Sequence, residues 1–269
     1  MSWGVFDSGV GGLTVVRALE RALPSTSLIY LGDTARVPYG VRSVDTVRRY
    51  AAQAGEFFGL AGVEGVIVAC NTVSAVALDA FHGAFGGTVL GVVEPGVGEA
   101  LRCTRQGRIG VIGTPATIRS DAYAARLREG RPGATIVSAA CPLFVPLAEE
   151  GWTEGEIPEK IARHYLEPVR DAGVDTVVLG CTHYPLLKDV ISRVLGGEVT
   201  LVDSAEAVAE ATRSLGVEAG QEGPAEERRS GHRFCLTDAG GAFTEVVERF
   251  LGHRVPFVET VQLDPSGAF

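Results

Sequence analysis

The sequence predicts an α/β protein with two pseudo-symmetric parallel-sheet domains and the active site in the cleft between them. Short runs of Val, Ile and Leu alternate with longer amphipathic stretches, which is typical of a parallel sheet covered by helices. Residues 61–72 (AGVEGVIVACNT) and 172–183 (AGVDTVVLGCTH) align without gaps at a constant offset (172 − 61 = 111). GVFDS (4–8) and GVIGT (110–114) match in the same way, each a strand that runs into a turn. The chain therefore contains two copies of one α/β unit.

The individual elements follow from the same patterns. Most of the apolar runs are short and apolar at nearly every position, as expected for strands covered on both faces. The predicted strands are 3–7, 27–31, 65–70, 88–93, 108–112, 134–139, 175–180 and 198–202. The predicted amphipathic helices are 43–60, 115–128, 154–170, 184–195 and 204–215. Three loops are predicted: VPYG (37–40, called the PYG loop), the proline-containing segment 140–152 and the polar segment 219–230. A strand-like HRFCLTD (232–238) and a helix-like AFTEVVERFL (242–251) follow, and periodicity does not assign them to a domain.

Composition and charge exclude several classes of protein. The 269 residues are 46% hydrophobic and 21% charged, as in ordinary globular proteins. A net charge of −9 argues against nucleic acid as the main partner. No apolar run reaches the length of a membrane span, and the N-terminus lacks a signal-peptide pattern. The five cysteines (70, 103, 141, 181 and 235) have no CxxC spacing, which predicts reduced thiols, no metal site and a cytoplasmic location.

Two of these cysteines stand at matching places in the repeat, and the other three are interpreted as structural. Cys70 ends the run GVIVAC, and Cys181 follows TVVLG. Ligands of parallel sheets bind at the carboxyl ends of the strands, where both thiols are expected. One such cysteine is usually an inert buried side chain, but a matched pair indicates a shared function. If the halves face each other, one thiolate can remove a proton from a carbon while the other thiol protonates the opposite face.

A thiol suits this chemistry because its pKa, about 8.5, lies near working pH. The polar residues after the two cysteines are predicted to cap the next helices: Asn71, Thr72, Ser74, Thr182 and His183. Such helix N-termini would bind a carboxylate and lower the pKa of a nearby thiol. Asp7 and His183 are candidates to orient or deprotonate the thiols. The alternatives are a helix cap for Asp7 and a capping or core role for His183.

The glycines of DSGVGGLT (7–14) allow a second hypothesis, a nucleotide-dependent oxidoreductase. Gly9 and Gly11 fit a dinucleotide fingerprint, and Asp33 lies at a suitable distance along the chain. Thr14, however, occupies the third glycine position, so this hypothesis is the weaker one. The glycines are predicted instead to let backbone N–H groups approach a small anion.

The sequence resembles glutamate racemases, a cofactor-independent group within the aspartate/glutamate racemase family. The resemblance covers essentially the whole chain. Five motifs carry it: FDSGVGGLTV (6–15), YLGDTARVPYG (30–40), ACNT (69–72), ACPLFVPLAEEG (140–151) and GCTHYPLL (180–187). The glycine-rich opening and the PYG loop favour the glutamate enzymes over their aspartate and hydantoin relatives.

The resemblance implies roles for particular residues. Cys70 and Cys181 would be the acid–base thiols, with Asp7 assisting the first and His183 the second. Glu149 would be a further carboxylate near the second thiol, although the adjacent Glu150 leaves the register open. The implied substrate-binding residues are Asp7, Ser8, Pro38, Tyr39, Gly40, Asn71, Thr72, Thr114, Thr117, Thr182 and His183.

The resemblance also implies the domain division and the biological setting. Residues 1–95 and 210–269 would form the first domain, and residues 96–209 the second. The implied substrate is L-/D-glutamate, with no cofactor and no metal, in a homodimer. D-Glutamate would supply peptidoglycan synthesis and thus cell-wall biogenesis and cell shape. The sequence starts almost on its first strand, without the extension of activator-dependent relatives, so activity without an activator is expected.

Two alternatives stay open beside this one. The chain could racemise a related acidic amino acid such as aspartate. It could also hold an amino acid without chemistry, or act mainly by contacting gyrase. A pure binder would need neither cysteine, which favours the enzyme.

Overall fold

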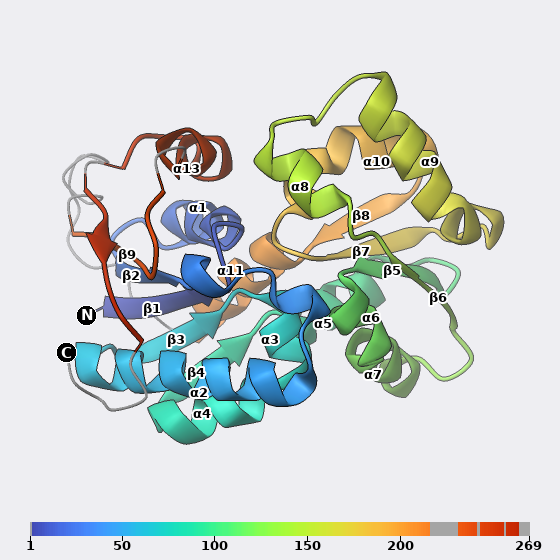
Figure 1. Cartoon of the computed structure of the whole chain (residues 1–269). Helices are drawn as coiled ribbons and strands as arrows, with labels where there is room; N and C mark the ends of the chain where they lie inside the picture. The colour runs from blue at the N-terminus through green and yellow to red at the C-terminus, as the bar shows by residue number, and fades with distance from the viewer. Residues whose placement is uncertain (1, 216–230, 241–242, 256, 264–269) are drawn as a thin grey trace.

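The computed structural model describes residues 2–215, 231–240, 243–255 and 257–263 and contains two parallel sheets flanked by helices (Figure 1). The six-stranded sheet has the order β10-β9-β2-β1-β3-β4, and the four-stranded sheet has the order β6-β5-β7-β8. Every pairing in both sheets is parallel. The predicted fold class is therefore confirmed.

The eight predicted strands are all present, with ends displaced by at most two residues. The first sheet contains β1 Ser2–Asp7, β2 Ser27–Gly32, β3 Gly65–Val68, β4 Thr88–Gly91, β9 Arg233–Leu236 and β10 Glu259–Thr260. The second contains β5 Arg108–Gly113, β6 Thr135–Ala140, β7 Thr176–Gly180 and β8 Thr200–Asp203. β3 and β7 are buried at every position, which explains their continuous apolar sequences.

The sequence repeat corresponds to a repeat of topology. The order β2-β1-β3-β4 in the first sheet matches the order β6-β5-β7-β8 in the second. β3 and β7, the two strands that the gapless alignment pairs, therefore hold equivalent places in their sheets. Cys70 and Cys181, which follow them, lie at equivalent strand ends.

The helices cover the faces of the two sheets. Around the first sheet are α1 Leu13–Ala22, α2 Val44–Ala61, α3 Asn71–Val76, α4 Leu78–Phe85 and α13 Phe243–Leu251. The remaining helices are α5 Val93–Cys103, α6 Pro115–Arg119, α7 Ala122–Gly130, α8 Phe144–Glu149, α9 Glu156–Asp171, α10 Lys188–Leu195 and α11 Ser204–Ser214. The described residues also form the 3₁₀ turns η1 Thr34–Arg36, η2 Tyr39–Val41 and η3 Tyr184–Leu187. Among the described helices, none combines the length and the apolar character needed to cross a bilayer.

Two predictions about helices and one about a loop were wrong. The segment 115–128 is two helices, because Asp121 adopts a left-handed conformation with φ of 56° between them. The segment 184–195 begins with the turn η3 before α10 starts. The segment 140–152 is not only loop, since α8 forms within it. Pro146 lies in the first turn of α8, where its missing N–H breaks no intrahelical bond.

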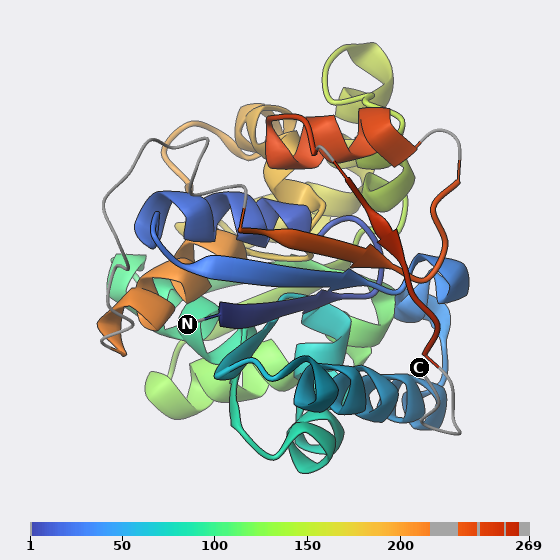
Figure 2. The same cartoon turned by 90° about the vertical axis from the view of Figure 1, so that its left-hand side faces the viewer.

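The C-terminal segment joins the first sheet. β9 pairs with β2, and β10 pairs with β9, so the strand predicted at 232–238 is confirmed there (Figure 2). The helix predicted at 242–251 is α13, which packs on α1. The loop predicted at 219–230 lies outside the described residues. The domain division stays a prediction, and its limit at 209/210 falls inside α11, which shares one core cluster with α1.

Candidate active site

A cavity of about 330 Å³ lies where the two units meet. This volume is in the range of small-molecule sites. Strand ends of both sheets reach it, with Ser8 after β1, Cys70 after β3, Thr114 after β5 and Cys181 after β7. Twelve of the predicted site residues line it: Ser8, Pro38, Tyr39, Gly40, Cys70, Asn71, Thr72, Thr114, Glu149, Cys181, Thr182 and His183.

The other two predicted residues lie behind the cavity wall. Asp7 is buried at the end of β1. Thr117 is also buried, and its hydroxyl lies 3.0 Å from that of Thr114 and 3.4 Å from that of Thr72. The Thr72 and Thr114 hydroxyls are 3.0 Å apart, so three threonines from the two units form one hydrogen-bonded group.

Sequence reasoning missed part of the lining. The additional residues are Gly9, Val37, Val41, Pro115, Pro142, Val145 and Pro146. Val37 and Val41 come from the PYG loop of the first unit, and Pro142, Val145 and Pro146 come from the segment around α8. The prolines of ACPLFVPLAEEG are the available signal, but proline is typical of loops and does not by itself indicate a cavity wall.

Cys70 is buried, and its thiol lies 3.3 Å from the Ser8 hydroxyl. Burial raises the pKa of Cys70 to about 12, with a further contribution from the negative charge of Asp7. The prediction that a helix N-terminus lowers this pKa is therefore wrong for Cys70. Hydrogen bonds with Ser8 and with the backbone of Val73 act in the predicted direction, but desolvation is larger.

Asp7 supports the loop that follows β1. Its Oδ2 accepts a hydrogen bond from Gly9 N–H at 2.9 Å, while its Oδ1 is buried with no hydrogen-bond partner. Burial raises the pKa of Asp7, and the opposing effects of His183 and of backbone N–H groups do not cancel it. Asp7 does not cap α1, whose N-cap is Gly12 and has no side-chain hydrogen bond.

Cys181, His183 and Glu149 form a chain of contacts on the other side. The Cys181 sulfur lies 3.8 Å from His183 Nδ1, and His183 Nε2 lies 2.9 Å from Glu149 Oε1. Burial lowers the pKa of His183, but its bonds with Cys181 and Glu149 outweigh burial and raise the pKa to about 10. The ring nitrogens are thus held between a sulfur and a carboxylate. Glu149, rather than the adjacent Glu150, makes this contact and lines the cavity, so Glu149 is the carboxylate near the second thiol.

The predicted caps after the two cysteines do not form. Asn71 and Thr72 lie inside α3, whose N-cap Cys70 makes no side-chain cap bond. Asn71 instead accepts a hydrogen bond from the Tyr123 hydroxyl at 2.6 Å, and Ser74 donates to the Val68 carbonyl. After Cys181 comes only the short turn η3.

The glycine-rich segment does not present Asp33 to a nucleotide. Asp33 is buried and bonded to Arg36 Nε at 2.6 Å, to the Tyr39 hydroxyl and to Thr237 Oγ1 at 2.9 Å. Its oxygens are thus taken, and the network holds the PYG loop. Thr14 donates to the Thr182 carbonyl at 3.0 Å, so it joins the two units instead of completing a fingerprint.

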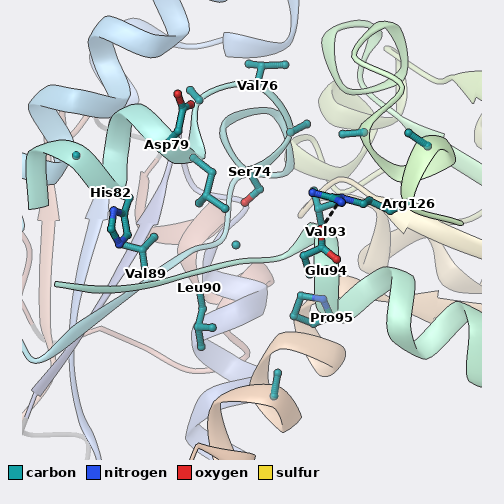
Figure 3. Close-up of a pocket in the computed structure, with 18 of the residues that line it drawn as sticks. Ser74, Val76, Asp79, His82, Val89, Leu90, Val93, Glu94, Pro95 and Arg126 are labelled. Atoms are coloured by element: carbon teal, nitrogen blue, oxygen red, sulfur yellow. Dashed lines mark ion pairs between the residues drawn. The ribbon is translucent and has the colours of Figure 1, made fainter. Parts of the chain in front are cut away.

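A larger cavity of about 1170 Å³ lies between α4, β4, α5 and α7 (Figure 3). An ion pair of 2.8 Å between Glu94 and Arg126 stands at one side of it. None of the predicted site residues is among its described lining residues. The described residues also contain no group of three His, Cys, Asp or Glu side chains arranged to hold a metal ion. The smaller cavity, which gathers both repeat cysteines, is the candidate active site.

Asp7→Asn is expected to raise the melting temperature at pH 7 and to lower turnover by about 10²-fold. Because the folded-state pKa of Asp7 lies above its ordinary value, the folded protein binds this proton more tightly than the unfolded chain does. That stabilisation is complete below the unfolded pKa and is lost as pH rises through the folded pKa. Asn carries no charge, so the difference in melting temperature in favour of Asp7→Asn should grow as the pH rises above about 4, the ordinary pKa of an aspartate. A melting-temperature difference that does not change with pH would contradict this.

The chain is similar to known proteins along its whole length. The family described as Asp/Glu/Hydantoin racemase matches residues 11–212. The glutamate racemase of Geobacter metallireducens is 48% identical over 267 residues, which cover 98% of each chain. Two solved structures agree with this likeness. Glutamate racemase from Francisella tularensis, in complex with D-glutamate, has a TM-score of 0.89 and 38% identity over 98% of each chain. Glutamate racemase from Aquifex pyrophilus has a TM-score of 0.80 and 45% identity over 95% of this chain and 97% of its own.

Proposed function

The chain belongs to the Asp/Glu/hydantoin racemase family, and we propose that it interconverts L- and D-glutamate with Cys70 and Cys181 as its two acid–base groups. The observation that carries the proposal is that two thiols, one from each unit of a repeated fold, line one small cavity. Inversion at a carbon requires one group to remove a proton and another to deliver one to the opposite face. A thiolate and a thiol at equivalent strand ends meet that requirement without a cofactor.

Each turnover removes one proton from the α-carbon and adds one proton to the opposite face of that carbon. One thiolate takes the α-proton, leaving a carbanion at the α-carbon, and the other thiol gives its proton to the opposite face. The two sulfurs then exchange their protonation states, and the reverse reaction uses them in the opposite order. The raised pKa of Cys70 makes it the protonated partner in the free enzyme. His183, whose pKa is raised, lies 3.8 Å from the Cys181 sulfur and can stabilise negative charge that develops there during proton transfer.

The cavity suits a dicarboxylic amino acid. Its described lining contains no Lys or Arg, so hydroxyl and backbone N–H groups, together with the His183 ring, are available to bind the carboxylates. Ser8, Thr72, Thr114 and Thr182 supply the hydroxyls. The buried, unpartnered Oδ1 of Asp7 lies behind the same wall and suits a cationic ammonium group nearby. Glutamate is favoured over aspartate by the relatives at 38–48% identity, which are named for glutamate.

The wider proposal concerns the setting of the reaction. D-Glutamate made here would supply peptidoglycan synthesis, and the enzyme would work in the cytoplasm as a homodimer. The resemblance to glutamate racemases supports these statements. All five cysteines are free thiols, which suits a reducing compartment.

The proposal is tested by proton NMR of the purified protein with L-glutamate in deuterated water, with polarimetry on the same sample. We expect the α-proton signal to disappear while the optical rotation decays to zero, without any added cofactor. If both persist for glutamate but change for aspartate, the substrate assignment is wrong and the reaction class stands. If both persist for every acidic amino acid that binds, the chain is a binding protein.

A further inference from the structure

The C-terminal helix α13 reaches from the first unit to the groups around Cys181. Phe250, near its end, is fully buried in the core cluster that also contains residues of α1 and β9. Its ring meets the His183 ring edge to face, with centroids 5.1 Å apart and an angle of 79°. Ala148 of α8 belongs to the same cluster, so this core of the first unit extends to the helix that carries Glu149. Figure 1 shows α13 lying over α1.

Arg249, the residue before Phe250, contacts the end of α8 through a backbone atom of that helix. Its guanidinium Nη1 donates a hydrogen bond to the carbonyl oxygen of Glu149, the last residue of α8. Gly151, two residues later, has φ of 75°, and a Cβ there would lie 2.8 Å from Arg249 Cζ. The turn after α8 is thus shaped to admit the guanidinium. A cation at this end also suits the negative end of the α8 dipole.

We propose that Arg249 and Phe250 are positioning residues for proton transfer at Cys181, because they fix the Glu149 turn and the His183 ring that faces the thiol. This inference rests on the proposed function. Neither residue lines the cavity, so they act through Glu149 and His183 rather than on substrate. The supports of the two thiols therefore differ. Cys70 is flanked by Asp7 and Ser8 of its own unit, whereas the support of Cys181 includes a helix of the other unit.

The groups that face His183 determine how a displacement of its ring would affect the nearby thiol. They are Asp7 from β1, Glu149 from α8 and the Cys181 thiol. A loosened His183 ring would hold its positive charge less closely to the sulfur. Cys181 should then ionise at a higher pH, while Cys70, which is flanked by other groups, should not change.

The test uses the pH dependence of iodoacetamide alkylation at each cysteine, measured by peptide mass spectrometry on the full chain. Arg249→Met and Phe250→Leu are expected to raise the pH of half-maximal alkylation of Cys181 and to leave that of Cys70 unchanged. Arg249→Lys should restore part of the shift. Two matched controls should leave it unchanged. Arg254→Met removes a cation paired with Glu248 of α13, and Phe234→Leu removes the same atoms from the same core cluster.

Racemisation is the second measurement on the same variants. Arg249→Met should lower kcat about tenfold with little change in KM, because binding contacts are kept. A change only in the maximal alkylation rate, or an equal change at both cysteines, would mean that accessibility or global packing had altered, and would overturn the inference. If Phe250→Leu does not fold, the two Arg249 variants decide. A Cys181-specific shift in a protein that racemises nothing would sink the proposed function while leaving the positioning role intact.

Discussion

Replacing either Cys70 or Cys181 by serine is expected to lower kcat for racemisation by about 10³-fold or more in both directions. Serine keeps the shape of the side chain, and both positions line a cavity with polar neighbours that can bond a hydroxyl, so the variants should fold like the parent. A hydroxyl, however, is a far weaker acid than a thiol, whose ordinary pKa is about 8.5. Each direction of the reaction needs one base and one acid, so the loss of either sulfur blocks both.

The two variants should still differ from each other. Each keeps one thiol, and that thiol can remove the α-proton of one enantiomer without inverting it. Slow exchange of the α-proton for deuterium is therefore expected with one enantiomer in Cys70→Ser and with the other in Cys181→Ser. The double variant should be about as slow in racemisation as either single one, because groups that act as a unit are not additive. Proton NMR of each enantiomer in deuterated water measures all of this.

Cys103→Ser is the matched control, since this half-buried thiol lies at the end of α5, outside the cavity lining. It should keep the turnover of the parent. Parental turnover in either Cys70→Ser or Cys181→Ser would show that the two-base assignment is wrong. Exchange of the same enantiomer by both variants would also count against it, because the thiols would then serve one face.

The parts of the fold that the sequence predicted are those specified by local patterns. Strands buried on both faces, such as β3 and β7, show as continuous apolar runs wherever they lie in the chain. The repeat aligned these strands and so placed Cys70 and Cys181 at equivalent ends. The local pattern predicted a loop where α8 forms, because proline is typical of loops but is also tolerated in the first turn of a helix.

Features that depend on long-range contacts could not be predicted in this way. The pKa of Cys70 is set by burial, which a helix-start argument does not contain. His232 and His253, isolated in sequence, both contact Glu20, at 3.5 Å and 3.0 Å. The contact of Phe250 with His183 joins residues in different units. In each case the cause is a neighbour that is distant along the chain, and no spacing within a motif reveals it.

Gly11→Ala is expected to lower kcat/KM by about 10²-fold or more and to destabilise the fold by about 1–3 kcal/mol, the usual cost of overpacking. A Cβ at this position would lie 2.2 Å from Thr182 Oγ1 and 2.5 Å from His183 Nδ1 and Cε1. The backbone of Gly11 is not in the left-handed region, so the effect is steric and not conformational. Gly11 thus allows the glycine-rich loop of one unit to approach the cysteine motif of the other.

The overlap with the added methyl group cannot be relieved by a small side-chain movement. His183 is bonded to Glu149 at 2.9 Å and packs against Phe250, so it cannot turn aside without losing those contacts. If the loop moves instead, the units separate and the cavity widens; if His183 moves, it leaves the Cys181 sulfur. Either response lowers the rate of proton transfer.

Gly59→Ala in α2 is the control, because its Cβ would meet open space and should stabilise the helix slightly. Parallel measurements of kcat/KM and thermal unfolding separate activity from folding, and a Gly11→Ala enzyme within about twofold of the parent would mean that this close approach is not required for catalysis.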